Sequence, residues 1–281
     1  MKKARLSLFS FAVTVGILWL GNARAHDDPA NTITALSQHI LESPDDPELY
    51  IRRGKLYRLA SSWEPALHDF NRAAELIEKT QEEYPVDLNF YIGASLLGAG
   101  EPEMALKHLN KSVEQYPSGS EALVIRADAY ASLGSFQIAA MDLARAIELA
   151  DHPQPGMYLK LAGLHVASDD TDAALATIDA GIKKLGAAIS LIQFAFEIEL
   201  ESGNYDAALL RIDQLPGSLR KTPNWLVRRG DTLLLADNPR AALANYQHAQ
   251  QAIIEMPALR RTTIAMLELQ KKIDLKVALL K

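Results

Sequence analysis

The sequence predicts an all-α protein in which pairs of antiparallel helices stack into a solenoid. The main observation is a pattern of small and large apolar residues that recurs six times at a nearly constant interval. Lone amphipathic segments flank the repeats on both sides, as expected for the two ends of a solenoid. The composition agrees, because 48% hydrophobic and 23% charged residues provide enough apolar side chains for a large core.

The repeated pattern begins at Pro47. In its first copy the small residues Gly54, Ala66 and Ala73 occupy relative positions 8, 20 and 27. The copies begin near residues 47, 86, 120, 155, 189 and 223, at intervals of 39, 34, 35, 34 and 34 residues. Small residues let two helices approach closely, and large apolar residues fill the space between neighbouring pairs. Each copy is therefore predicted to be one helix pair.

This pattern resembles the tetratricopeptide-repeat (TPR) family, whose period is about 34 residues. The resemblance implies a right-handed superhelical solenoid of six TPR helix pairs over residues 47–256, with a capping helix at each end. The N-terminal cap is expected within residues 26–46, where Asn31 to Leu41 is amphipathic, and the C-terminal cap within residues 257–281. The apolar face of the C-terminal helix also offers a surface for a homodimer.

Some positions depart from the pattern or sit at its turns. The long first interval, around Lys79 to Tyr84, predicts an extended second helix in the first pair. In the fifth copy Phe196 and Glu199 stand where a small and a large apolar residue belong, and Pro216-Gly217 ends the second helix early. A local irregularity is therefore expected there. Helix starts and turns are marked by capping and left-handed residues: Asp46-Pro47, Asp169-Asp170, Gly100 and Gly134.

The N-terminus has the three parts of a secretory signal peptide. A basic start precedes an apolar run from Leu6 to Leu20, and Ala23-Arg24-Ala25 follows with small residues at the cleavage positions. The run is shorter than the roughly 20 residues that span a bilayer, which favours cleavage of residues 1–25 over a retained anchor. Export by the Sec route to the periplasm or the medium of a bacterium is expected. A lipoprotein anchor is excluded because the chain has no cysteine.

The charge and the motifs favour an interaction protein over an enzyme. Without the four basic residues of the signal, 25 Lys and Arg face 35 Asp and Glu, a net charge of −10 that opposes nucleic-acid binding. No phosphate loop, nucleophile elbow or paired-His metal motif occurs, so no catalytic residue, cofactor or metal site is predicted. His165 is expected to pack in the core. The alternative function is metal handling or catalysis, at an N-terminal His26 or in the groove.

In TPR proteins the first helices of the pairs line a concave groove, chiefly through positions 2, 5, 9, 12 and 13. Transferred to this sequence, these positions predict a partner-binding groove that includes Lys55, Arg58, Phe90, Asp128, Gln193, Glu197 and Asp231. Ile51, Ala94, Leu97, Val124, Leu159, Gly163 and Val227 also fall on them. The groove would be basic at its N-terminal end and acidic at its C-terminal end, orienting a peptide by charge, unless these charges are only a solvated face.

The same resemblance excludes one mode of binding and predicts a function. Family members that grip a chaperone's C-terminal carboxylate use Lys and Asn at positions 5 and 9 of an early unit. Here those positions hold Ile51 and Lys55, and then Phe90 and Ala94, so that clamp is absent. The predicted function is a non-catalytic scaffold or adaptor of the bacterial cell envelope that binds a protein or peptide segment in its groove.

Overall fold

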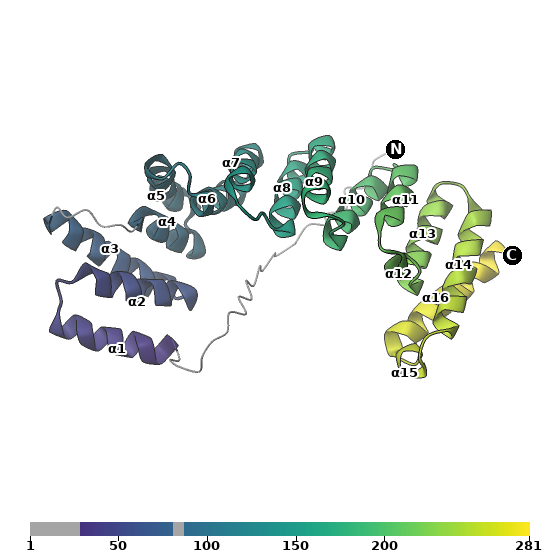
Figure 1. Cartoon of the computed structure of the whole chain (residues 1–281), viewed down its shortest axis with the longest axis horizontal. Coiled ribbons are helices and arrows are strands. Elements are labelled where there is room, and N and C mark those ends of the chain that lie inside the picture. Colours follow the sequence, from purple (N-terminus) through teal and green to yellow (C-terminus); the bar gives the residue numbers. More distant parts are fainter. Residues whose placement is uncertain (1–28, 81–86) are drawn as a thin grey trace.

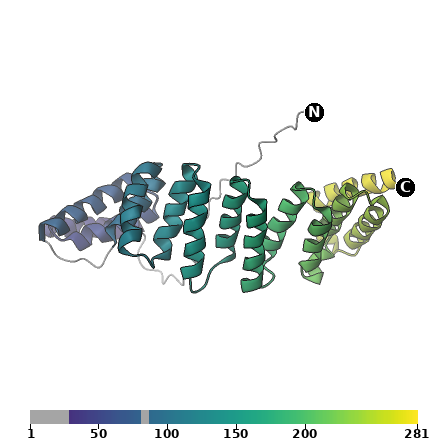
Figure 2. The same ribbon diagram turned by 90° about the horizontal axis from the view of Figure 1, so that it is seen from above.

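The computed structural model describes residues 29–80 and 87–281, and within these ranges it contains helices and no strand. Six antiparallel pairs follow one another along an arch, with α1 at one foot and α16 at the other (Figure 1). Seen from above, the helices stand side by side in a row (Figure 2). The prediction of an all-α solenoid of helix pairs is confirmed. The predicted signal peptide, His26 and residues 81–86 lie outside the described residues.

Each pair joins a first and a second helix through a short turn. The pairs are α2 (Pro47–Leu59) with α3 (Trp63–Thr80), α4 (Leu88–Gly98) with α5 (Pro102–Gln115), α6 (Ser120–Ser132) with α7 (Phe136–Leu149), α8 (Pro155–Ala167) with α9 (Thr171–Leu185), α10 (Ile189–Glu201) with α11 (Tyr205–Gln214), and α13 (Pro223–Leu235) with α14 (Pro239–Ile254). The main contacts join successive helices, and α4 with α6 and α8 with α10 are further first-helix contacts. Each pair is therefore stabilised by its neighbours along the row.

The turn inside every pair uses a left-handed residue at relative position 15. Gly100, Gly134 and Gly203 have φ values of 84°, 74° and 77°. The other three pairs place Ser61, Asp169 and Asp237 there, with φ values of 55°, 61° and 55°. Glycine adopts this conformation without steric cost, whereas other residues adopt it with some strain. The predicted role of Gly100 and Gly134 in these turns is confirmed.

Small residues in the first helices face large ones in the second helices. A Cβ added to Gly54 would lie 2.7 Å from the Phe70 ring, and one added to Gly230 would lie 2.6 Å from the Tyr246 ring. Both rings are fully buried. Glycine at relative position 8 thus makes room for the aromatic ring at position 24, and the two helices pack closely.

The fifth pair departs from this arrangement, because a large residue stands at position 8. Phe196 stands at position 8, is buried, and packs edge-on against Trp225 with ring centroids 5.7 Å apart. Glu199 is also buried, and its Oε1 accepts a hydrogen bond from Arg211 Nε at 3.0 Å. The second helix α11 has 10 residues, and after Pro216 a single turn, α12 (Gly217–Arg220), leads to α13. The expected irregularity is present at this pair.

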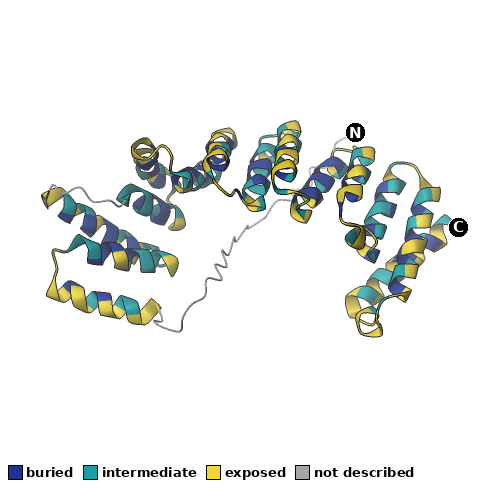
Figure 3. Ribbon diagram, viewed as in Figure 1, coloured by how far each residue is buried: buried dark blue, intermediate teal, exposed yellow. Residues whose placement is uncertain are grey.

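The ends of the row carry the remaining helices. At the N-terminal end α1 (Pro29–Glu42) packs on α2 through Leu36 and Ile40. At the other end the segment expected as one capping helix is two helices, α15 (Ala258–Arg261) and α16 (Ile264–Leu280), and α16 packs on α14. Buried residues lie where neighbouring helices face each other, along the whole row, and exposed residues lie on the surfaces that face away from other helices (Figure 3).

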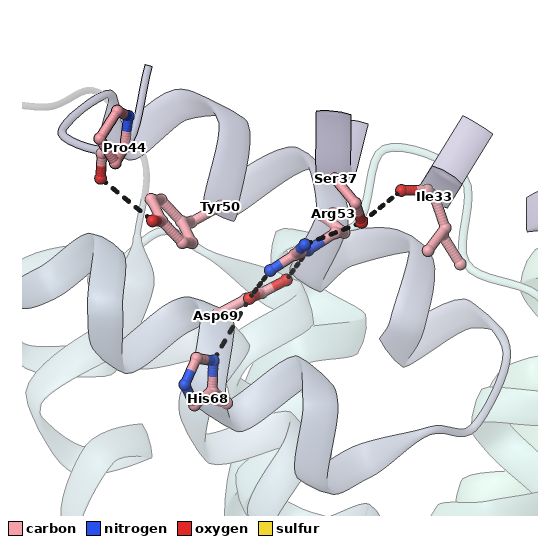
Figure 4. A network of polar contacts seen from close by, with 7 residues as sticks. All are labelled: Ile33, Ser37, Pro44, Tyr50, Arg53, His68 and Asp69. Atoms are coloured by element: carbon pink, nitrogen blue, oxygen red, sulfur yellow. Dashed lines mark hydrogen bonds and ion pairs between the residues drawn. The ribbon is translucent and has the colours of Figure 1, made fainter. Parts of the chain in front are cut away.

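Two buried arginine–aspartate pairs fasten first helices to second helices. Arg53 donates two hydrogen bonds of 2.7 Å to Asp69, and Arg126 donates two of 2.7 Å to Asp142. Arg53 also reaches Ser37 of α1 at 2.8 Å, so that one side chain joins three helices (Figure 4). Bidentate geometry of this kind fixes the relative position of the helices.

Candidate functional site

The surface formed by α2, α4, α6, α8, α10 and α13, here called the first-helix face, holds the predicted partner-binding residues. Along this face, acidic side chains at position 9 of one first helix contact the first helix of the next pair. Asp128 of α6 pairs with Lys160 of α8, and Glu197 of α10 pairs with Arg228 of α13 at 2.5 Å. Both cations stand at position 6 of their helix. This register links neighbouring pairs electrostatically.

The predicted acidic end of the groove is corrected by these contacts. Asp231 of α13 continues the series, because it pairs with Lys276 of α16 and accepts a hydrogen bond of 2.5 Å from Tyr246 Oη. Asp128 and Glu197 are thus each paired with a cation from the first helix of the next pair, and Asp231 is paired with a cation from α16. A peptide would meet ion pairs there rather than free carboxylates, so the charge gradient predicted from the sequence is absent at that end.

The basic end of the face keeps its charge. Lys55 Nζ lies 4.8 Å from the centroid of the Tyr91 ring, and the Arg58 guanidinium carbon lies 5.6 Å from it. Among the described residues neither cation has an acidic partner, and Arg58 Nε is buried without a hydrogen-bond partner. Cations over an aromatic face are stabilised by the ring quadrupole. The two cations are therefore held in place without being neutralised.

Aromatic rings support this basic end. Phe70 stacks on Tyr91 with centroids 5.4 Å apart, and Phe90 meets Tyr91 edge-on at 5.2 Å. Phe90 was predicted from its position, whereas Tyr91 at position 6 was not. Tyr91 could have been found by comparing neighbouring repeats in pairs. In such a comparison position 9 of one repeat, here Lys55, lies opposite position 6 of the next repeat, here Tyr91.

An open depression of about 290 Å³ lies beside these rings. It is lined by Lys55, Asp87, Phe90, Tyr91, Tyr116, Gly119, Glu121 and Ala122. The two oxygens of Asp87 are engaged, one by the backbone N–H of Phe90 at 2.9 Å and the other by Ser112 Oγ at 2.5 Å. The depression therefore combines the Lys55 ammonium group and apolar ring surface with two carboxylates, those of Asp87 and Glu121, and has room for a side chain of a bound segment.

Of the remaining predicted residues, some line a second depression, two belong to the core, and Leu97, Val124, Leu159 and Gly163 are half-buried. Gln193 and Val227 line a depression of about 380 Å³, together with Asn224, Trp225, Arg228 and Leu269. Ile51 and Ala94, also expected on the groove, are instead 0% and 8% exposed and belong to the core. Ile51 packs in a cluster with residues of α1 and α3, because α1 covers the outer side of α2.

Comparison with known proteins identifies the architecture. Neither a protein-family model nor a curated protein sequence matches the chain. Among solved structures, the C-terminal part of a TPR repeat-containing protein from Cytophaga hutchinsonii matches with a TM-score of 0.65 and 13% identity, over 86% of this chain and 94% of that one. A tetratricopeptide repeat protein from Parabacteroides merdae matches with a TM-score of 0.52 and 18% identity, over 88% and 93%.

The protein has the tetratricopeptide-repeat fold. A solved chain of MamA from Desulfovibrio magneticus RS-1, from residue 41 to the end, is a further match, with a TM-score of 0.50 and 19% identity, over 55% of this chain and 84% of that one. At these identities the likeness establishes the fold of the six helix pairs.

The described part of this TPR solenoid contains no group of three or more His, Cys, Asp or Glu side chains placed to hold a metal ion. His108 Nδ1 lies 3.1 Å from Asn89 Oδ1, and burial lowers the pKa of His108. His68 is exposed and stands beside Asp69, and His165 is half-buried rather than packed in the core as expected. Within residues 29–80 and 87–281, no helix is both long and apolar enough to cross a bilayer.

Proposed function

We propose that this protein is a non-catalytic interaction scaffold that binds a polypeptide segment on its first-helix face. The observation that carries the proposal is the basic end of that face, where Lys55 and Arg58 lie over Tyr91 without an acidic partner among the described residues. Farther along the face Asp128, Glu197 and Asp231 are each matched by a cation, whereas Glu121 at the start of α6 forms no ion pair with a described residue. A binding surface with free cations at one end takes a ligand in one orientation.

The chemistry of the depression specifies the segment. Ammonium and guanidinium groups donate charge-assisted hydrogen bonds to carboxylates, which are about twice as strong as neutral ones. Phe90 and Tyr116 offer apolar surface next to Lys55. The preferred ligand is therefore a segment that places a carboxylate at Lys55 and Arg58 and an aromatic or aliphatic residue in the depression, where Asp87 and Glu121 would repel a second acid. Its remaining length would continue toward α6 and α8 along the first-helix face.

Selection from a random peptide library tests this proposal. Immobilised wild-type protein should enrich acidic peptides that contain an apolar residue, and the Lys55→Glu/Arg58→Glu variant should lose that enrichment. The matched control is Lys183→Glu/Lys184→Glu, which reverses two exposed charges on the second helix α9. Enrichment that is the same in wild type and in the Lys55→Glu/Arg58→Glu variant would move the binding surface elsewhere on the solenoid.

Export through the Sec route is the second part of the proposal. It rests on the basic, apolar and small-residue parts of residues 1–25, which are followed by His26. The protein would act in the periplasm or outside the cell, without a lipid anchor. Terminal sequencing of protein purified from an envelope fraction should begin at His26, whereas a start at Met1 would show that the segment is retained.

A homodimer through the C-terminal helix is the alternative use of its exposed leucines. The helix α16 exposes Leu267, Leu275 and Leu279. Sedimentation velocity over a range of protein concentrations decides between monomer and dimer. A single species of constant sedimentation coefficient would exclude the homodimer at the concentrations used.

A further inference from the structure

The two ends of the solenoid present different surfaces. At the N-terminal end, α1 buries Leu36 and Ile40 and turns Asn31, Thr34 and Gln38 outward. Leu41 is its one large hydrophobic residue that is strongly exposed. A polar outer face is what a terminal cap of a repeat protein needs for solubility. The N-terminal cap has that property.

The C-terminal end lacks a polar outer face of this kind. The inner face of α16 packs on α14 through the buried residues Ile273 and Val277. Its outer face carries a row of exposed apolar residues, here called the C-terminal stripe: Leu259 on α15 and Ile264, Leu267, Leu275 and Leu279 on α16. The α16 members recur at intervals that place them on one side of a helix. Leu259 is 86% exposed and Leu279 is 75% exposed, so this cap is apolar on both faces.

Positive charge surrounds the C-terminal stripe. Residues 258–281 contain six Lys and Arg and two acidic residues, whereas the whole chain has a net charge of −6. Lys271 and Lys272 are exposed at the middle of the stripe and form no ion pair with a described residue. Lys276 is bound to Asp231, and Asp274 accepts a hydrogen bond from Gln250. The other acidic residue, Glu268, is exposed on the same side of α16 as the stripe. The end of an acidic molecule is thus basic and apolar at once.

We propose that this end of the solenoid docks on an anionic lipid surface. Exposed leucines along one side of a helix, flanked by lysines, are the features of a helix that lies in the membrane interface. The leucines of the stripe would enter the boundary between head groups and acyl chains. The lysine stems would lie along apolar surface while their ammonium groups reach lipid phosphates.

Charge favours this occupant over a second copy of the chain. Two stripes facing each other would join two basic ends, because residues 258–281 of each copy carry six Lys and Arg against two acidic residues. The opposite end of the molecule is also a poor partner, because α1 offers a polar face to the leucines. An anionic bilayer meets both the leucines and the lysines. It also repels the acidic body, so the solenoid would stand end-on with its first-helix face accessible.

Vesicle flotation tests the proposal, with vesicles of phosphatidylcholine alone and of phosphatidylcholine with phosphatidylglycerol. Both the full chain and the form that begins at His26 are used, because an apolar residue 1–25 segment would bind both vesicle types. Wild type should bind the anionic vesicles more strongly, and added salt should weaken that binding. Leu275→Glu/Leu279→Glu and Lys271→Glu/Lys272→Glu should each reduce it more than about tenfold.

The control variant is Leu210→Glu, which places the same charge at an exposed leucine of α11. It should bind anionic vesicles like wild type, and circular dichroism should show that all variants are folded. Three results would overturn the proposal. These are absence of binding to anionic vesicles, equal binding by wild type and the stripe variants, and a dimer that Leu275→Glu/Leu279→Glu abolishes, which would assign the stripe to a second copy.

Discussion

Single buried charges decide how firmly the helix pairs are joined. Asp69 is buried and accepts both hydrogen bonds of the Arg53 guanidinium, and Asp142 does the same for Arg126. Removing one partner of such a pair leaves the other charge without compensation in a site shielded from water. These two arginines occupy the same relative position in the first and third pairs, so the same contact recurs in two of the six pairs.

The Asp69→Ala variant should therefore lose about 3 kcal/mol of unfolding free energy. Urea unfolding followed by circular dichroism measures the loss. The control is Asp213→Ala, which removes the partner of Arg229 in a pair that is 31% and 43% exposed, and it should cost less than about 1 kcal/mol. Equal losses in the two variants would show that burial of the Asp69 pair does not matter.

The left-handed turn residues allow a second test at this scale. Gly134 has φ of 74°, so Gly134→Ala should destabilise the protein by about 1 kcal/mol even though no atom lies near the added methyl group. Gly163 lies within α8 with open space around it and an ordinary φ. Gly163→Ala should instead stabilise by about 0.5–1 kcal/mol. Thermal unfolding of the two variants should shift in opposite directions, and shifts in the same direction would contradict the account.

Glu199 gives a prediction about pH. Burial raises the pKa of Glu199, and its Oε2 has no hydrogen-bond partner among the described residues. Because its pKa is higher in the folded state, the folded state binds more protons, and this residue lowers stability as pH rises above the ordinary carboxyl value of 4.5. Glu199→Gln removes that dependence while Arg211 keeps Asp179. The stability of the variant relative to wild type should increase with pH, and parallel pH curves would contradict this.

At the scale of helices, the repeat pattern predicts most of the architecture. Small residues at positions 8, 20 and 27 are buried in nearly every pair, because close helix packing requires them. The pattern does not reveal α12 and α15, which have four residues each and are too short for a helical period. Reading each unit alone also hides the cross-helix ion pairs, such as Asp231 with Lys276, which are separated by 45 residues.

The packing of small against large residues is itself testable. A methyl group at Gly230 would meet the buried Tyr246 ring, which also holds Asp231 through its hydroxyl group. Gly230→Ala should cost about 1–3 kcal/mol, the usual range for overpacking. Gly156→Ala, near the start of α8 with open space around it, is the control. Chemical denaturation should separate the two variants, and an unaffected Gly230→Ala would show that Tyr246 moves aside without cost.

For the whole molecule, the local balance of charge changes along the arch. The middle and far parts of the first-helix face carry matched ion pairs, the N-terminal part keeps two free cations over Tyr91, and the C-terminal cap is basic in an otherwise acidic chain. The sequence predicted Lys55, Arg58 and Phe90 near the face, but it also predicted Ile51 and Ala94 there, and these two lie in the core. It could not predict the net charge of the face, because neutralisation depends on side chains of the following repeat.

The most direct test of the account is a charge-swap titration at Lys55. An acidic peptide enriched by the wild-type protein is titrated by calorimetry against wild type and Lys55→Glu, together with a peptide whose acidic residue is replaced by lysine. The account predicts that Lys55→Glu weakens the acidic peptide at least about tenfold, and that the lysine peptide regains affinity on the variant. Equal affinity of the acidic peptide for both proteins would contradict the claim that this end of the first-helix face recognises carboxylates.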